Sequence, residues 1–295
     1  MTLRSTVRPA KVVVCGMVWH TIRRSEEGLV ADDALTGPAI GAALGVRAAG
    51  AQPLLMAALP ACQSVNALRL VRKLDQSGEL LRDRDLPPLR WIAPALVGTK
   101  RDWVLEGDPR GWVAQCDPAD LQAATLILAN ANPRAYATLL SGARPSFTAM
   151  DIDGRWGPTQ LDALKACLPH VQLLTVTRTD LARLPRGLLA GTGIGRRPGT
   201  VLLVKDGPAG VTARIDDQER SWPAPPCDRE PSTDIGAGDL LLGILGTIIG
   251  CSPTPVTHAV AEAAYVRAMP TLSALLTSVN FVAFADSLLG PGYVE

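Results

Sequence analysis

The chain has 295 residues, of which 47% are hydrophobic and 19% charged, which suits one large α/β domain with an added lid and a sizeable core. The net charge is +1, and Lys and Arg are spread along the chain, which argues against a nucleic-acid partner and an anionic membrane surface. No run reaches 18 apolar residues, which argues against a membrane span. Six widely spaced cysteines without a CxxC pair predict buried thiols in a reducing cytoplasm, not disulfides or a zinc site.

The first 115 residues predict regular elements separated by two segments of mixed pattern. The run 11–16 is β-branched and ends in Gly, which is typical of a buried first strand. Small residues dominate 37–50, which indicates a helix packed close to a sheet or a ligand. A strand and a helix are expected next, over 53–59 and 64–77. The two mixed segments are assigned to a small β lid near 17–35 and 91–115.

From residue 121 onward, strand and helix patterns alternate. Strands are expected over 124–129, 146–152, 171–176 and 200–205, and helices over 134–140, 159–168, 239–249 and 255–268. This alternation predicts one α/β domain over 1–295, with a three-layer, doubly wound, mostly parallel sheet and helices on both faces. Ligands of such sheets bind beyond the carboxyl ends of the strands. The polar or Gly residues there are Asn130, Asn132, Asp151, Asp153, Thr177, Asp180, Asp206 and Gly207.

The sequence Gly236-Ala237-Gly238-Asp239 opens directly into an apolar helix. The first amides of a helix have no partner within it and carry partial positive charge, and two Gly residues let an anion approach that backbone closely. Asp239 could take a proton from a hydroxyl nucleophile. The arrangement therefore predicts a phosphoryl-binding helix start, and the competing interpretation is an ordinary loop-to-helix junction with Asp239 as N-cap.

This motif resembles the second signature of the ribokinase-like or PfkB carbohydrate kinases, Asp-Thr-x-Gly-Ala-Gly-Asp. The chain keeps the Gly-Ala-Gly-Asp part, and its Thr233-Asp234 looks like the first two residues exchanged. The resemblance implies an ATP-dependent kinase of a sugar-like or nucleoside-like alcohol. It also implies that the amides of Gly236, Ala237, Gly238 and Asp239 form the anion hole, and that Asp239 is the catalytic base.

Further motifs of the same family appear in the same order. Gly207 and Gly210 resemble the Gly-x-x-Gly of its nucleotide site, with Lys205 in place of the preceding Thr. Thr177 and Asp180 fall where the family has Asn-x-x-Glu, whose acid helps hold magnesium and phosphate through water. The resemblance thus implies ATP and Mg²⁺ as cofactors, with Asp180 at the metal. A monovalent cation is a further option, because Thr233-Asp234 lies where that site would form.

The departures from the family pattern gather on the acceptor side. His20 stands where the family has an acidic sugar ligand, Thr36-Gly37 replaces a Gly-Gly pair, and Gly41 replaces an Asn. Asp151 and Arg155 belong to a segment that resembles the family's Asp-x-Asn-x-Arg, and together with His20, Gly37 and Gly41 they are the predicted acceptor contacts. These changes argue against a plain hexose or ribose. The resemblance also implies a homodimer through the lid.

Two alternatives remain open at this point. The altered Thr233-Asp234, Thr177 and Gly41 are consistent with a catalytically weak or inactive ribokinase-like protein that only binds ligand. The fold class alone would also allow a flavodoxin-type or dehydrogenase-type enzyme with a bound flavin or nicotinamide. The sequence lacks the P-loop pattern GxxxxGK[ST], the GxSxG elbow and HExxH, so those three classes are not supported.

Overall fold

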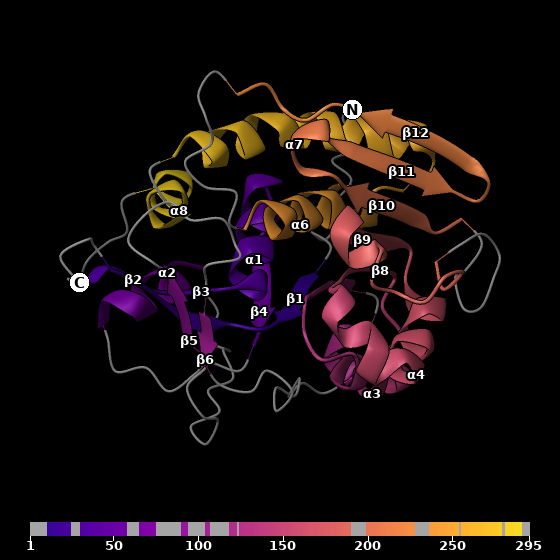
Figure 1. Cartoon of the computed structure of the whole chain (residues 1–295), viewed down its shortest axis with the longest axis horizontal. Coiled ribbons are helices and arrows are strands. Elements are labelled where there is room, and N and C mark those ends of the chain that lie inside the picture. The colour runs from indigo at the N-terminus through magenta and orange to yellow at the C-terminus, as the bar shows by residue number, and fades with distance from the viewer. Residues whose placement is uncertain are drawn as a thin grey trace, which may run out of the picture.

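The central feature of the protein is an eight-stranded sheet (Figure 1). The computed structural model describes residues 11–24, 30–57, 65–74, 90–93, 104–106, 118–122, 124–189, 199–227, 236–253, 255–278 and 281–290. The strand order is β12-β11-β10-β9-β8-β7-β1-β4, and the six strands from β10 to β4 are parallel. The strands are β1 (Val12–Gly16), β4 (Pro53–Met56), β7 (Thr125–Ala129), β8 (Phe147–Ile152), β9 (Leu173–Thr177), β10 (Val201–Lys205), β11 (Val211–Ile215) and β12 (Gln218–Trp222).

Helices cover both faces of this sheet, as the alternation predicted. One face carries α1 (Pro38–Ala48), α2 (Val65–Leu74), α6 (Ala237–Gly250), α7 (His258–Thr277) and α8 (Phe281–Leu289). The other carries α3 (Pro133–Gly142) and α4 (Gly157–Cys167). Because successive side chains of a strand point to opposite faces, Val12 and Val14 of β1 enter the first core and Val13 and Cys15 enter the second. The doubly wound three-layer fold is confirmed.

A second, four-stranded sheet contains the segments assigned to the lid. Its order is β3-β2-β5-β6, with β2 (Trp19–Arg24), β3 (Val30–Thr36), β5 (Arg90–Ala93) and β6 (Val104–Glu106). β2 pairs with β3 in antiparallel and with β5 in parallel orientation. The small β lid is therefore confirmed, although most of the segment 94–115 lies outside the described residues.

The small residues of α1 serve a helix-to-helix contact. A methyl carbon on Gly45 would lie 2.2 Å from the Leu240 carbonyl oxygen, and one on Gly243 would lie 2.1 Å from the Ala42 carbonyl oxygen. α1 and α6 thus approach each other at backbone distance. The predicted close packing is real, but the principal partner is α6, whose residues Leu240 to Thr247 are all buried. A helix buried on all sides is expected to be apolar all round.

Several elements differ from the predicted ones. The expected helix 255–268 continues to Thr277 through Pro270, and the antiparallel pair β11-β12 and the helix α8 were not expected. Single-turn helices complete the described elements, namely η3 (Pro118–Leu121), η4 (Gly154–Trp156), η5 (Leu168–His170), η6 (Gly207–Ala209) and the four-residue α5 (Arg178–Leu181). None of the helices in the described part of the chain is long and apolar enough to cross a membrane.

Candidate active site

The start of α6 has the geometry expected of an anion site. Gly236 is its N-cap in the left-handed conformation, with φ 79°, and the Gly236 carbonyl oxygen accepts from the Leu240 amide at 2.8 Å. A methyl carbon on Gly236 would lie 2.6 Å from the Phe281 ring, so neither its conformation nor its surroundings admit a side chain. The residues that follow, Ala237, Gly238 and Asp239, form the first turn of the helix.

Asp239 lies in the first turn of α6, three residues after the N-cap. The interpretation of Asp239 as N-cap is therefore wrong, because Gly236 holds that position. A methyl carbon on Gly41 would lie 2.8 Å from the Asp239 Cβ, and the Gly41 amide donates to the Gly37 carbonyl oxygen at 3.0 Å. The structure thus brings Gly37, Gly41 and Asp239 together at the facing ends of α1 and α6.

A buried ion pair lies beside this helix start. The Lys205 Nζ donates to the Asp151 Oδ1 at 2.6 Å, and a methyl carbon on Gly238 would lie 3.0 Å from the same Nζ. Burial acts to lower the pKa of Lys205, but the charge of Asp151, its hydrogen bond and the charges of Asp239 and Asp180 raise it, which keeps the ammonium charged. Asp151, which was predicted to contact the acceptor, is therefore bound to a residue that was predicted to contact the nucleotide.

Asp153 and Arg155 hold the loop that follows β8. The Arg155 Nε donates to both Asp153 oxygens, at 2.9 and 2.8 Å, and the Asn130 side-chain amide donates to Asp153 Oδ2 at 3.1 Å. Burial opposes the charge of Asp153, but the hydrogen bonds and charge of Arg155 outweigh it and hold the Asp153 pKa below its usual value. Arg155 is half exposed and engaged within its own loop, so its acceptor contact stays a prediction.

Thr177 and Asp180 form a cap at the start of the short α5. The Asp180 amide donates to the Thr177 hydroxyl at 3.0 Å, and that hydroxyl donates to the Asp180 Oδ2 at 2.5 Å. Asp180 Oδ1 lies 3.5 Å from the Arg183 guanidinium, and the side chain is 18% exposed. Mg²⁺ typically keeps several waters and takes one or two carboxylates plus phosphates, so one partly exposed carboxylate fits an outer contact to it. The described residues contain no cluster of three or more metal-ligating side chains.

The loop between β10 and β11 places the predicted nucleotide glycines next to these groups. Gly207 has φ 54° and Gly210 φ 93°, and the Asp206 amide donates to the Gly210 carbonyl oxygen at 2.9 Å. A methyl carbon on Gly210 would lie 2.1 Å from the Trp222 carbonyl oxygen, so the loop is fixed against β12. Residues 207 to 209 are exposed, which leaves this backbone accessible to a ligand.

On the acceptor side, the residues at the start of α1 meet strand β2. A methyl carbon on Gly37 would lie 3.2 Å from the Trp19 ring, and the hydroxyls of Thr21 and Thr36 are hydrogen-bonded to each other. His20 pairs with the buried Leu35 and points to the face of β2 opposite Trp19 and Thr21. The acceptor contact of His20 stays a prediction, and Gly37 lies next to Trp19 rather than next to His20.

Three residues near the site were not singled out from the sequence as site residues. The Thr175 hydroxyl donates to Asp151 Oδ1, while Trp19 and Thr21 lie near the start of α1. Strand periodicity could have indicated Thr175, since it follows Leu173 by two residues and therefore shares its face. The sequence held no comparable signal for Thr21, whereas Trp19 falls in the expected lid, where an aromatic side chain could cover a substrate or an oligomer face. Thr233 to Ile235 lie outside the described residues.

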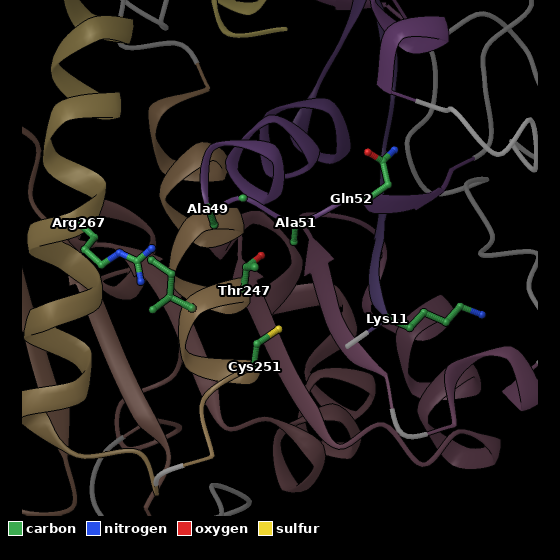
Figure 2. A pocket seen from close by; sticks show the side chains of 9 residues that line it. Lys11, Ala49, Ala51, Gln52, Thr247, Cys251 and Arg267 are labelled. Carbon is green, nitrogen blue, oxygen red and sulfur yellow. The ribbon is translucent and has the colours of Figure 1, made fainter. Parts of the chain in front are cut away.

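A separate cavity of about 550 Å³ opens at the other end of the sheet (Figure 2). Its lining includes Lys11, which precedes β1, Gln52, which precedes β4, and Cys251, which follows the last turn of α6. These residues lie at the amino ends of the strands. The predicted site residues lie at the carboxyl ends, so the cavity takes no part in the site described above.

Comparisons with known proteins identify the fold. No protein-family model matches the sequence, and no curated protein does. Among solved structures, the chain is similar to aminoimidazole riboside kinase from Salmonella enterica, in complex with aminoimidazole riboside and an ATP analog. The TM-score is 0.68 at 16% sequence identity, with 95% of this chain and 100% of that chain covered.

Two further similarities agree with the first. Fructokinase from Vibrio cholerae O395, bound to fructose, ADP and calcium, matches with a TM-score of 0.72 at 11% identity, over 96% of this chain and 99% of that chain. The nucleoside kinase of Methanocaldococcus jannaschii, an archaeal member of the ribokinase family, matches with a TM-score of 0.66 at 12% identity, over 95% and 98%. The chain therefore has the ribokinase-like fold, as its motifs predicted.

Proposed function

We propose that the protein is an ATP-dependent kinase that phosphorylates a hydroxyl of a small sugar-like or nucleoside-like molecule. The observation that carries this proposal is the start of α6, where the amides after Gly236, the Asp239 side chain and the Lys205 ammonium meet within one turn. At this point the amides can bind a phosphoryl group, Asp239 can act as a base and Lys205 can supply a positive charge. The kinases with the same fold support the proposal.

The proposed reaction moves one phosphoryl group and one proton. The acceptor oxygen forms a bond to the γ-phosphorus, the bond from that phosphorus to the bridging oxygen breaks, and ADP leaves with the electron pair. Asp239 takes the hydroxyl proton. The amides of residues 236–239 stabilise the charge on the transferred group, and each such donor contributes roughly 100- to 1,000-fold in rate. A positioned base contributes roughly 100- to 10,000-fold.

The nucleotide is expected along the loop of Gly207 to Gly210, whose residues 207 to 209 are exposed, next to Thr177 and Lys205 at the ends of β9 and β10. Asp180 is the residue expected to hold Mg²⁺, which when bound would supply positive charge to neutralise the phosphates. The acceptor is expected between the start of α1 and Asp239. We further expect a cytoplasmic protein that dimerises through the lid sheet, and gel filtration with light scattering would test the dimer.

The alternative is a ribokinase-like protein that binds ligands without catalysis. ATP turnover in the presence of a panel of primary alcohols, from sugars to nucleosides, separates the two functions. With an accepted alcohol, Asp239→Asn should remove nearly all turnover while ATP binding, measured by calorimetry, stays roughly intact. Unchanged turnover in Asp239→Asn would refute the role of Asp239. Absence of turnover with every alcohol, together with normal ATP binding, would favour the non-catalytic alternative.

A further inference from the structure

Three polar residues form a row across neighbouring strands beneath the start of α6. Asp151, Thr175 and Lys205 come from β8, β9 and β10, and Asp151 pairs directly with Thr175 in the sheet register. Each follows by two residues an apolar residue of the core that contains α6, namely Ala149, Leu173 and Leu203. Because strand side chains alternate, all three point to the face that α6 covers. The sheet therefore places these three side chains beneath the proposed anion site at the start of α6.

Within the row, Asp151 is bound from two sides. Its Oδ1 accepts from the Thr175 hydroxyl and from the Lys205 Nζ, the latter at 2.6 Å. The side chains of Asp151 and Lys205 are each only 11% exposed. A buried charge is costly unless it is paired and hydrogen-bonded, so the Asp151 carboxylate offsets the cost of burying the ammonium.

The ammonium of this ion pair lies next to the start of α6. Its Nζ lies 3.0 Å from the position of a methyl carbon on Gly238, the middle residue of the anion hole. An ammonium carries three donors, and Asp151 accepts one of them, so another can be given to an anion at the start of α6. The Lys205 ammonium thus lies against the start of α6.

We propose that Lys205 is a catalytic cation for the transferred phosphoryl group, and that Asp151 is a positioning residue that holds the Lys205 ammonium against Gly238. This inference rests on the proposed kinase function and deepens it, because it replaces the predicted acceptor contact of Asp151 with a role at the phosphate. The ligand class is a polyphosphate chain. The lack of a side chain at Gly238 is part of the site, since a methyl group there would meet the ammonium.

The first arm of the test measures binding without catalysis, with inorganic tripolyphosphate as the probe in calorimetry. Lys205→Met should weaken binding by on the order of 10- to 100-fold, the equivalent of one charge-assisted hydrogen bond. Lys73→Met is the matched control, because Lys73 makes a comparable ion pair with Asp286, at 3.0 Å, between α2 and α8. Equal binding by Lys205→Met and wild type would overturn the proposal, and so would an absence of binding by the wild type.

The second arm tests whether Asp151 acts through Lys205, in a double-mutant cycle on kcat and KM with an accepted alcohol. Lys205→Met should lower kcat by roughly 100-fold with a smaller change in the KM of the acceptor. Asp151→Asn should lower kcat in the wild type but add nothing in the Lys205→Met background. The double variant buries neither charge, so it provides a folded reference if Lys205→Met alone is unstable. Additive losses, or a loss confined to the acceptor KM, would overturn the positioning role.

A pH profile separates positioning from a merely structural role. The groups around the Lys205 ammonium are Asp151, Asp180 and Asp239, and their negative charges favour its protonated form. Activity that needs the ammonium is lost as pH rises through its pKa. Asp151→Asn removes one of the negative charges, so the alkaline loss should move to lower pH, and an unmoved alkaline limb would count against the proposal. If no alcohol is turned over, the kinase function fails, but the tripolyphosphate arm still decides the role of Lys205.

Discussion

Replacing Gly41 with Ala adds one methyl group at the point where α1 meets Asp239. The added carbon would lie 2.8 Å from the Asp239 Cβ, whereas non-bonded carbons rest about 3.5 to 4.0 Å apart. Asp239 or α1 must therefore move by roughly 0.7 to 1.2 Å. A displacement of about 1 Å in a catalytic group can cost on the order of 100-fold in rate. We expect kcat to fall by that order, while ATP binding changes little because the Gly207 loop belongs to other strands.

The assay is ADP release with an accepted alcohol, corrected for the folded fraction by thermal unfolding. Gly246→Ala is the matched control, since it adds a methyl group to the same buried helix α6 two turns beyond Asp239. That carbon would lie 3.1 Å from side-chain atoms of Ala149 and Ile127, which can shift by a few tenths of an ångström. Wild-type turnover in folded Gly41→Ala would refute the reasoning. An equal loss in Gly246→Ala would assign the effect to general repacking of the core.

Three further predictions follow from single contacts. Gly236→Ala should lower the free energy of unfolding by roughly 1 to 3 kcal/mol in denaturant titrations, because Gly236 has φ 79° and lies against the Phe281 ring. Asp153→Asn should reduce stability at neutral pH but not near pH 2. Because the pKa of Asp153 is lower in the folded protein, its charge contributes stability above the usual carboxyl pKa, and this stability is lost as pH falls through the folded-state pKa. An equal loss of stability in Asp153→Asn at both pH values would contradict this reasoning. Asp180→Asn should raise the Mg²⁺ concentration for half-maximal turnover by about 10-fold, and an unchanged Mg²⁺ titration would remove Asp180 from the metal site.

The fold could be predicted because its evidence is local and repeated. Four of the six parallel strands, β4, β7, β8 and β9, are followed by a helix, and burial of the sheet on both faces gives its strands continuous apolar runs. The helix start at Gly236 to Asp239, where we propose the anion site, could be predicted for a similar reason, since these residues are consecutive in the chain. The antiparallel pair β11-β12 and the helix α8 lack such a signature, because short antiparallel strands and a late helix depend on what they pack against.

The acceptor side was harder to predict because its contacts join distant segments. Spacing from Gly16 pointed to His20, but the strand pairing places His20 beside Leu35, on the face opposite Trp19. Gly41 was expected near the acceptor, and the structure places it directly against Asp239, the proposed base. A count along the chain fixes neither the face of a strand nor the partner across a helix interface, so these roles needed coordinates.

The contact that Asp151 makes could not be predicted from its position in the chain either, and this contact bears on the proposed function. Its motif position suggested an acceptor ligand, but its partner Lys205 lies on β10, two strands away in the sheet and 54 residues away in the chain. The two residues compare differently with the motifs that the chain resembles, since Asp151 keeps the Asp of its motif and Lys205 stands in place of a Thr. The Lys205 ammonium and the Asp151 carboxylate lie 2.6 Å apart and form one ion pair beside Gly238. In the role that we propose for Lys205, this change adds a positive charge at the start of α6, which is an argument for the active kinase over the inactive alternative.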